Sequence, residues 1–165
     1  MPIAQHVGVL VTGVLWAFLF DQRRKKKVEM QSREITVVYV DAENVSARKW
    51  RKIRESLSDI SGKLYVRIYM RKNDPGTKRW RTICEQESGY CVKEIAVEGK
   101  AKRNKVDKVI ISEMLSMKTD VVCIVSSDHG YGNSVEECKR KGSRVYGFGS
   151  GKKLARHCND YYFIT

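Results

Sequence analysis

The chain has 165 residues, which is enough for one domain of ordinary size with a buried core. Its 32 Lys and Arg against 19 Asp and Glu leave a formal net charge of +13. This charge favours a polyanionic partner, either nucleic acid or an anionic membrane surface. The alternative is a basic protein that has no such partner. The five cysteines contain no Cys-x-x-Cys pair, which argues against a zinc site or a disulfide framework and for a reducing compartment.

The first twenty residues differ from the rest of the chain. Val7–Phe20 is a nearly uninterrupted apolar run, and a helix over residues 2–20 would be about 28 Å long, close to the thickness of a bilayer core. The basic sequence DQRRKKK follows directly, which predicts that this side stays in the cytoplasm. We therefore expect an N-terminal anchor at 1–21, a basic and polar linker at 22–34, and a single-pass protein of the cytoplasmic membrane with its domain inside. The alternatives are an apolar helix packed on the protein or a partner, and an export signal.

Beyond residue 34, buried strand patterns alternate with amphipathic helix patterns. Ile35–Val40 is rich in β-branched residues and apolar on both faces, as a strand of a covered parallel sheet is. Residues 46–60 then repeat apolar side chains along one helical face. The further predicted elements, in chain order, are a strand at 64–70, a helix at 76–87, strands and helices at 91–97, 106–117, 121–125, 131–141, 143–148 and 152–158, and a final aromatic segment at 161–164. This alternation predicts an α/β domain at 35–165, Rossmann-like, with a mostly parallel sheet flanked by helices.

Acidic side chains follow two of the buried strands. Asp41 closes the first strand, with Asn44 three residues later, and Asp128 closes the strand at 121–125. Asp107 begins the helix at 106–117, whose apolar face turns inward, so we expect it to point along the sheet toward the same edge. Each Asp alone could equally be a helix cap. Ligands of open α/β sheets gather at the carboxyl ends of the strands, and carboxylate ligands there suit Mg²⁺ or Mn²⁺.

Four short motifs carry a resemblance to a known family. They are VYVDAEN at 38–44, NKVDKVIISE at 104–113, VSSDHGY at 125–131 and ARHCNDYYFI at 155–164. In this order they resemble the NYN domains of the PIN-like nuclease superfamily, particularly its LabA-like branch. The resemblance implies a Rossmann-like parallel sheet, a divalent-metal site and RNA cleavage.

The resemblance also implies roles for single residues. Asp41 and Asn44 match the first motif, Asp107 the second and Asp128 the third, so these four are the expected catalytic residues. The three Asp are also the expected metal ligands. Glu113 stands where family members often have another acid, although it lies about 120° from Asp107 around an ideal helix.

The third motif departs from the family pattern. Members commonly have Ser-Gly-Asp-x-Asp-Phe there, whereas the second acidic position in this chain is Gly130. The missing carboxylate implies one metal ion rather than two, weaker metal binding, or lost catalysis. His129 could serve as a base or a phosphate contact, and its alternative is an ordinary solvated loop residue.

Basic residues near these positions are candidates for binding nucleic acid. One cluster precedes Asp107, and a second contains Arg79 beside Trp80, an arrangement that suits phosphate contact with base stacking. The members of the first cluster are Lys100, Lys102, Arg103 and Lys105. Single-stranded RNA is favoured because no groove-reading helix motif is evident, and the alternative for each cluster is a solvated face.

These observations lead to one expected function and two alternatives. The expected function is that of a membrane-tethered, metal-dependent endoribonuclease that hydrolyses phosphodiester bonds of single-stranded RNA. The first alternative is a catalytically degenerate RNA-binding module, which the glycine at position 130 suggests. The second is a scaffold subunit of a membrane complex, with a membrane partner or a second copy of the chain as its contact.

Overall fold

A computed structural model of the chain describes residues 16, 19–25, 34–60, 62–96 and 105–164. It divides into two compact units, Met1–Arg33 and Glu34–Thr165. In the first unit, residues 19–25 are helical and Lys25 forms an ion pair with Asp21 at 2.7 Å. In the parts of the chain that are described, no helix is long and apolar enough to cross a membrane. The predicted anchor over residues 2–20 lies almost wholly outside them.

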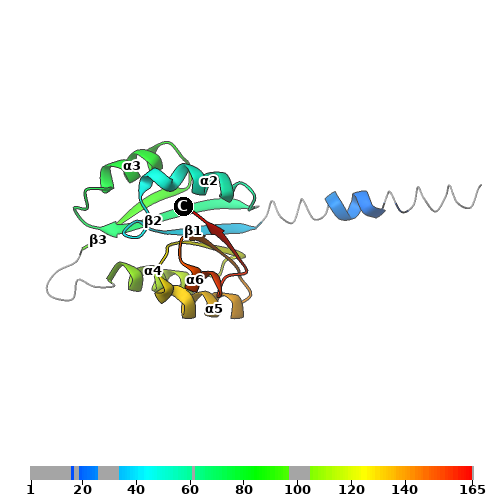
Figure 1. Cartoon of the computed structure of the whole chain (residues 1–165). Helices are drawn as coiled ribbons and strands as arrows, with labels where there is room; N and C mark the ends of the chain where they lie inside the picture. The colour runs from blue at the N-terminus through cyan, green and yellow to red at the C-terminus, as the bar shows by residue number, and fades with distance from the viewer. Residues whose placement is uncertain (1–15, 17–18, 26–33, 61, 97–104, 165) are drawn as a thin grey trace, which may run out of the picture. The chain divides into compact units, whose positions relative to one another are not determined.

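The second unit is built on a six-stranded sheet in which every neighbouring pair of strands is parallel (Figure 1). The strands are β1 (Ile35–Asp41), β2 (Lys63–Arg71), β3 (Tyr90–Ile95), β4 (Val121–Val125), β5 (Arg144–Gly149) and β6 (Asp160–Phe163). Their order across the sheet is β3-β2-β1-β4-β5-β6. This confirms the predicted α/β class with a parallel sheet.

Helices cover both faces of the sheet (Figure 1). On one face lie α2 (Trp50–Leu57) and α3 (Thr77–Glu85). On the other face lie α4 (Lys105–Ser116), α5 (Gly132–Arg140) and the short α6 (Lys152–Ala155). Two 3₁₀ turns, η1 (Ala47–Lys49) and η2 (His129–Tyr131), precede α2 and α5.

The two faces of β1 explain why its residues 37–40 are all apolar. Val38 and Val40 belong to the core layer beneath α2 and α3, and Val37 and Tyr39 belong to the layer beneath α4 and α5. Side chains alternate between the faces of a strand, so a strand covered on both sides needs apolar residues at every position. The prediction from the β-branched run is confirmed.

Several element boundaries differ from the predicted ones. The helix predicted over residues 46–60 is divided into η1 and α2 and ends at Leu57, where the amide of Ser58 bonds back to Arg54 and Glu55. The helix predicted at 152–158 ends at Ala155, and the strand predicted at 91–97 ends at Ile95. The spacing of apolar residues does not show where these elements end, because the turns that follow them have hydrogen bonds of their own and continue the same spacing.

The order of strands places a topological switch point in the middle of the sheet. The chain moves outward from β1 to β2 and β3, returns to β4 on the other side of β1, and then moves outward again. The carboxyl ends of β1 and β4 therefore border the crevice in which open parallel sheets bind ligands. The predicted acidic residues that follow these two strands lie at this crevice.

Candidate functional site

Asp41 is the centre of the site and is completely buried. It is the last residue of β1, and its backbone carbonyl accepts hydrogen bonds from the amides of Asn44 and Val45. This turn brings the side chain of Asn44 back to Asp41, so that its Nδ2 donates to Oδ2 at 2.5 Å. The amide of Glu43 donates to the other carboxylate oxygen at 3.2 Å. The local sequence DAEN thus builds the first half of the site.

The second half comes from the segment that follows β4. The hydroxyls of Ser126 and Tyr131 each donate to Oδ2 of Asp41 at 3.1 Å. Burial raises the pKa of Asp41 above its usual value, and the hydrogen bonds from Asn44, Tyr131, Ser126 and Glu43 oppose that rise. A buried carboxylate is costly unless donors surround it, and four donors do so here.

The hydroxyl of Tyr131 connects Asp41 with Asp107. It lies 2.8 Å from Oδ1 of Asp107, which is half-buried in the first turn of α4. A phenol carries one proton and can donate to only one carboxylate at a time. Burial raises the pKa of Asp107, the charges of Asp41 and Asp128 raise it further, and the Tyr131 hydrogen bond opposes them. Asp107 therefore lies within electrostatic range of both other predicted aspartates.

Asp128 lies on the loop after β4 and caps η2. Its Oδ1 accepts a hydrogen bond from the amide of Gly130 at 2.8 Å, and its own amide donates to the hydroxyl of Ser126 at 3.1 Å. The capping role that was the alternative for this residue is therefore present. Its side chain is about one third exposed (37%), which leaves it open to a ligand. His129, at 3.5 Å from Asp128, is 71% exposed.

Ser126 and Tyr131 complete the site, although neither was among the predicted site residues. Both stand in VSSDHGY, the motif that contains Asp128. Their side chains are buried, and each contacts Asp41, which lies 85 or more positions earlier in the chain. The available signal was their position beside Asp128, in the segment that follows β4.

Glu113 does not join the aspartates. Its carboxylate contacts Arg67 at 2.7 Å, the Tyr69 hydroxyl at 2.9 Å and Lys93 at 2.6 Å. Burial raises the pKa of Glu113, but the bonds from Lys93, Tyr69 and Arg67 outweigh burial and hold that pKa below its usual value. Two cations already neutralise this carboxylate, so it is a poor candidate for the metal ligand that the family resemblance implied.

The predicted nucleic-acid residues have different outcomes. Lys100, Lys102 and Arg103 lie outside the described residues, whereas Lys105 is exposed at the start of α4. Arg79 is also exposed on α3. The expectation for Trp80 was wrong, because its side chain is 1% exposed and packs edge-on against Trp50 in the core. A ring in that position cannot stack on a base.

The donor chemistry of the site suits a hard divalent cation. Asp41, Asp107 and Asp128 supply oxygen ligands from three separate segments, and the repulsion of Asp107 by the other two is of the kind that a bound cation relieves. Within the described ranges, however, no three His, Cys, Asp or Glu side chains are grouped closely enough to hold an ion. Each aspartate instead accepts hydrogen bonds from protein donors. The three side chains therefore have suitable donor atoms for such a cation, but they are not arranged around a common coordination site.

Comparisons with known proteins agree with this architecture. A crystal structure of a protein of unknown function from Vibrio parahaemolyticus superposes with a TM-score of 0.64 at 18% sequence identity. The match covers 81% of this chain and 94% of that one, and at this identity it supports the fold alone. No match was found among the curated proteins. Residues 35–165 match the family model of the NYN domain. The chain therefore belongs to the NYN domain family, whose members are generally nucleases, and its function is of this nuclease-like, RNA-related kind.

Proposed function

We propose that the chain is a metal-dependent endoribonuclease that hydrolyses phosphodiester bonds within single-stranded RNA. The observation that carries this proposal is the linked pair of Asp41 and Asp107, joined through Tyr131 with Asp128 in electrostatic range, at the switch point of an NYN domain. Carboxylates held this close together at the edge of the sheet are better explained by binding of a cation and a phosphate than by a contribution to stability.

In this proposal Asp41, Asp107 and Asp128 would hold Mg²⁺ or Mn²⁺. The cation would supply an activated water and stabilise the charge that develops on the phosphate. Asn44 and Ser126 fix the orientation of the Asp41 carboxylate through hydrogen bonds of 2.5 and 3.1 Å. The Tyr131 hydroxyl holds Asp41 and Asp107 at a shared atom, which limits how far their carboxylates move apart.

A cleavage assay with the full chain in non-ionic detergent tests the function. The wild type should cut single-stranded RNA internally with Mn²⁺ or Mg²⁺ and stop when a chelator is added. Asp41→Asn should lower the rate by orders of magnitude with nearly unchanged RNA affinity, because it alters the reacting centre and not the basic surface. Asp59→Asn, an exposed aspartate beyond α2, is the matched control and should retain the rate.

A second candidate function is that of a degenerate RNA-binding module. The glycine at position 130, where family members commonly carry an acid, favours it. A wild-type protein that binds RNA tightly and leaves it intact with every divalent metal would contradict cleavage and support this candidate.

We also propose that residues 2–20 tether the protein to the cytoplasmic membrane with the NYN domain on the cytoplasmic side. The support is the apolar run that ends at Phe20 and the five basic residues at positions 23–27. A membrane partner or a second copy of the chain would meet the protein through this segment.

A further inference from the structure

A groove of about 1010 Å³ opens beside the acidic site. One wall is the segment that follows β1, beginning with Ala42 and Glu43, and the other is the start of α3. Glu43 belongs to both features, because its amide donates to Oδ1 of Asp41 while its carboxylate pairs with Arg71 in the groove wall. A ligand in this groove would therefore lie next to the buried carboxylate of Asp41.

The groove is lined by more basic than acidic side chains. Arg48, Arg71, Lys78 and Arg79 face two acids, of which Glu43 is paired with Arg71. The second acid, Asp74, accepts a hydrogen bond from the amide of Gly76 at 2.7 Å. Among the residues that the structure describes, the charged groups of Arg48, Lys78 and Arg79 have no partner. Three uncompensated cations in one groove form a site for a polyanion.

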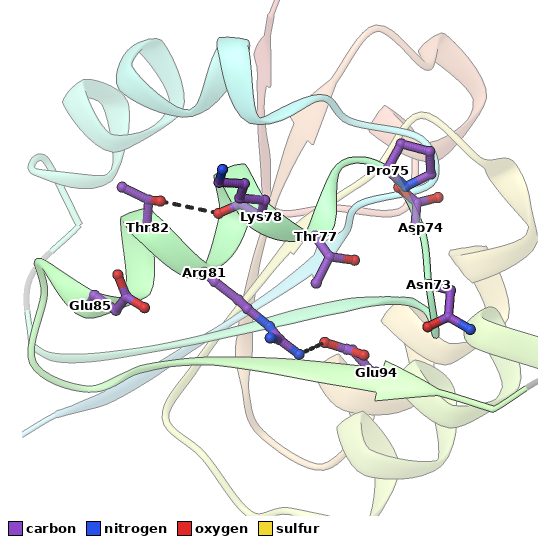
Figure 2. Close-up of a pocket in the computed structure, with 9 residues that line it drawn as sticks. All are labelled: Asn73, Asp74, Pro75, Thr77, Lys78, Arg81, Thr82, Glu85 and Glu94. Atoms are coloured by element: carbon purple, nitrogen blue, oxygen red, sulfur yellow. Dashed lines mark hydrogen bonds and ion pairs between the residues drawn. The ribbon is translucent and has the colours of Figure 1, made fainter.

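A smaller pocket of about 510 Å³ adjoins the groove along α3 and shares Lys78 with it. It is lined by two basic and three acidic side chains, and Arg81 is paired with Glu94 (Figure 2). Figure 2 also shows that Lys78 and Arg81 leave α3 in different directions, with the amine of Lys78 turned away from the Arg81–Glu94 pair. Of the two uncompensated cations of α3, Arg79 lines only the groove beside the acidic site, whereas Lys78 lines both pockets.

We infer that this groove binds the segment of single-stranded RNA next to the phosphate that is cleaved. This inference rests on the proposed function for its substrate. Arg48, Lys78 and Arg79 contact successive phosphates, while Pro75 and Ile83 offer apolar surface to a sugar or base. The RNA chain then continues past Glu43 to the aspartates, so the strand reaches the site from the α2–α3 face of the sheet.

The experiment compares two triple variants of the full chain in non-ionic detergent. One removes the groove cations (Arg48→Ala, Lys78→Ala, Arg79→Ala). The other removes the same formal charge from paired arginines elsewhere (Arg51→Ala, Arg81→Ala, Arg140→Ala), which pair with Glu55, Glu94 and Glu137. Fluorescence anisotropy with a labelled oligouridylate in chelator measures Kd across salt concentrations. All six side chains are exposed, so thermal melts should show that both variants fold.

The groove variant should weaken RNA binding at least about tenfold more than the control variant. Its slope of log Kd against log salt should fall by about 2, since each phosphate contact to single-stranded RNA contributes about 0.7. Equal weakening by both variants would overturn the inference, because it would show only the effect of overall charge. Displacement of the RNA by polyglutamate at equal charge would also overturn it, in favour of an acidic protein partner.

Cleavage assays on the same preparations separate this inference from the proposed function. If the wild type does not cleave but the groove variant still weakens binding and lowers the salt slope, the groove stands and the nuclease function fails. If the wild type cleaves and both variants bind and cleave RNA alike, the function stands and the groove is overturned.

Discussion

At the scale of single residues, the site depends on which hydrogen-bond donors surround each aspartate. Asp41 is within hydrogen-bond distance of four donors, of which the Tyr131 hydroxyl is shared with Asp107, and Asp128 accepts from the amide of Gly130. Each of these donors lowers the cost of burying or crowding a carboxylate. We therefore expect that replacing one of these donors, or a residue next to an aspartate, changes the stability of the protein and its affinity for metal.

Gly130 is the position at which an added carboxylate is most informative. A Cβ there would lie 3.4 Å from Oδ1 of Asp128, an ordinary contact, so a side chain fits. Gly130→Asp should lower the melting temperature of the metal-free protein through repulsion with Asp128. It should also tighten Mn²⁺ binding about tenfold by calorimetric titration, because a further oxygen ligand is supplied.

Gly130→Asn is the control for this change, since it has the same size without the charge. It should leave Mn²⁺ affinity close to that of the wild type. Identical Mn²⁺ affinity in the Asp and Asn variants would mean that no cation is bound beside Asp128.

Tyr131→Phe removes the hydroxyl that Asp41 and Asp107 share. Asp41 and Asp107 would lose the one donor that they share, which is the only side-chain donor to Asp107 among the described residues. We expect the free energy of unfolding of the metal-free protein to fall by about 1–3 kcal/mol, measured by urea denaturation. Tyr162→Phe, whose ring stacks on Phe148, is the control and should cost much less. Equal losses in the two variants would show that the shared hydroxyl does not stabilise the site.

At the scale of elements, helix α4 is held to the sheet by an ionic cluster as well as by its apolar face. Val106, Ile110 and Met114 are buried against the sheet. Glu113, on the same helix, bonds to β2 through Arg67 and Tyr69 and to β3 through Lys93. Because α4 also carries Asp107, this cluster fixes the helix that places one of the three aspartates.

Glu113→Gln should weaken this attachment in a manner that depends on pH. The pKa of Glu113 is held below its usual value, so its contribution to stability is complete above the unfolded pKa of about 4.3 and is lost as the pH falls through the lower folded value. At neutral pH the variant should lose on the order of 1–2 kcal/mol, since the cluster is only partly buried.

The difference in melting temperature between wild type and Glu113→Gln should therefore shrink in strongly acidic buffer. Glu137→Gln is the control, because Glu137 pairs with Arg140 on the exposed face of α5 and should contribute little. A difference between wild type and Glu113→Gln that stays constant from neutral to strongly acidic pH would contradict the role of the ionised carboxylate.

At the scale of the whole molecule, the chain joins an apolar N-terminal segment to a basic NYN domain. In its first unit, the described residues Trp16, Leu19 and Phe20 bring three large apolar side chains close to the basic run at positions 23–27. Such side chains favour a lipid or protein neighbour over water. This observation supports the proposed tether.

The full chain should therefore fractionate with membranes and be released by detergent but not by high salt. A chain that begins at residue 34 should be soluble and show cooperative unfolding, because the second unit contains both core layers. Protease added to spheroplasts should spare the domain. Recovery of the full chain in the soluble fraction without detergent would contradict the tether.

Much of the fold was determined by the sequence alone. The apolar run of β1 and the five-residue run of β4 predict strands covered on both faces, and their alternation with helical patterns predicts the parallel sheet. Because the carboxyl ends of parallel strands meet at one edge, the positions of Asp41 and Asp128 also predicted their proximity. Such inferences need only the spacing of apolar residues along the chain and the rule that parallel strands end at the same edge of a sheet.

Only the tertiary structure decided which side chains contact one another at that edge. Tyr131 bonds to Asp107, 24 positions earlier, and to Asp41, 90 positions earlier, while Glu113 turns to Lys93 and Arg67. Trp80, between two arginines in the sequence, packs inside because it shares a helical face with Ile83 against the core. The periodicity of apolar residues along the chain predicts which face of a helix or strand a residue occupies. Its contacts depend on how distant segments pack, because burial of an unpaired polar group raises the free energy of the folded state and burial of an apolar ring lowers it.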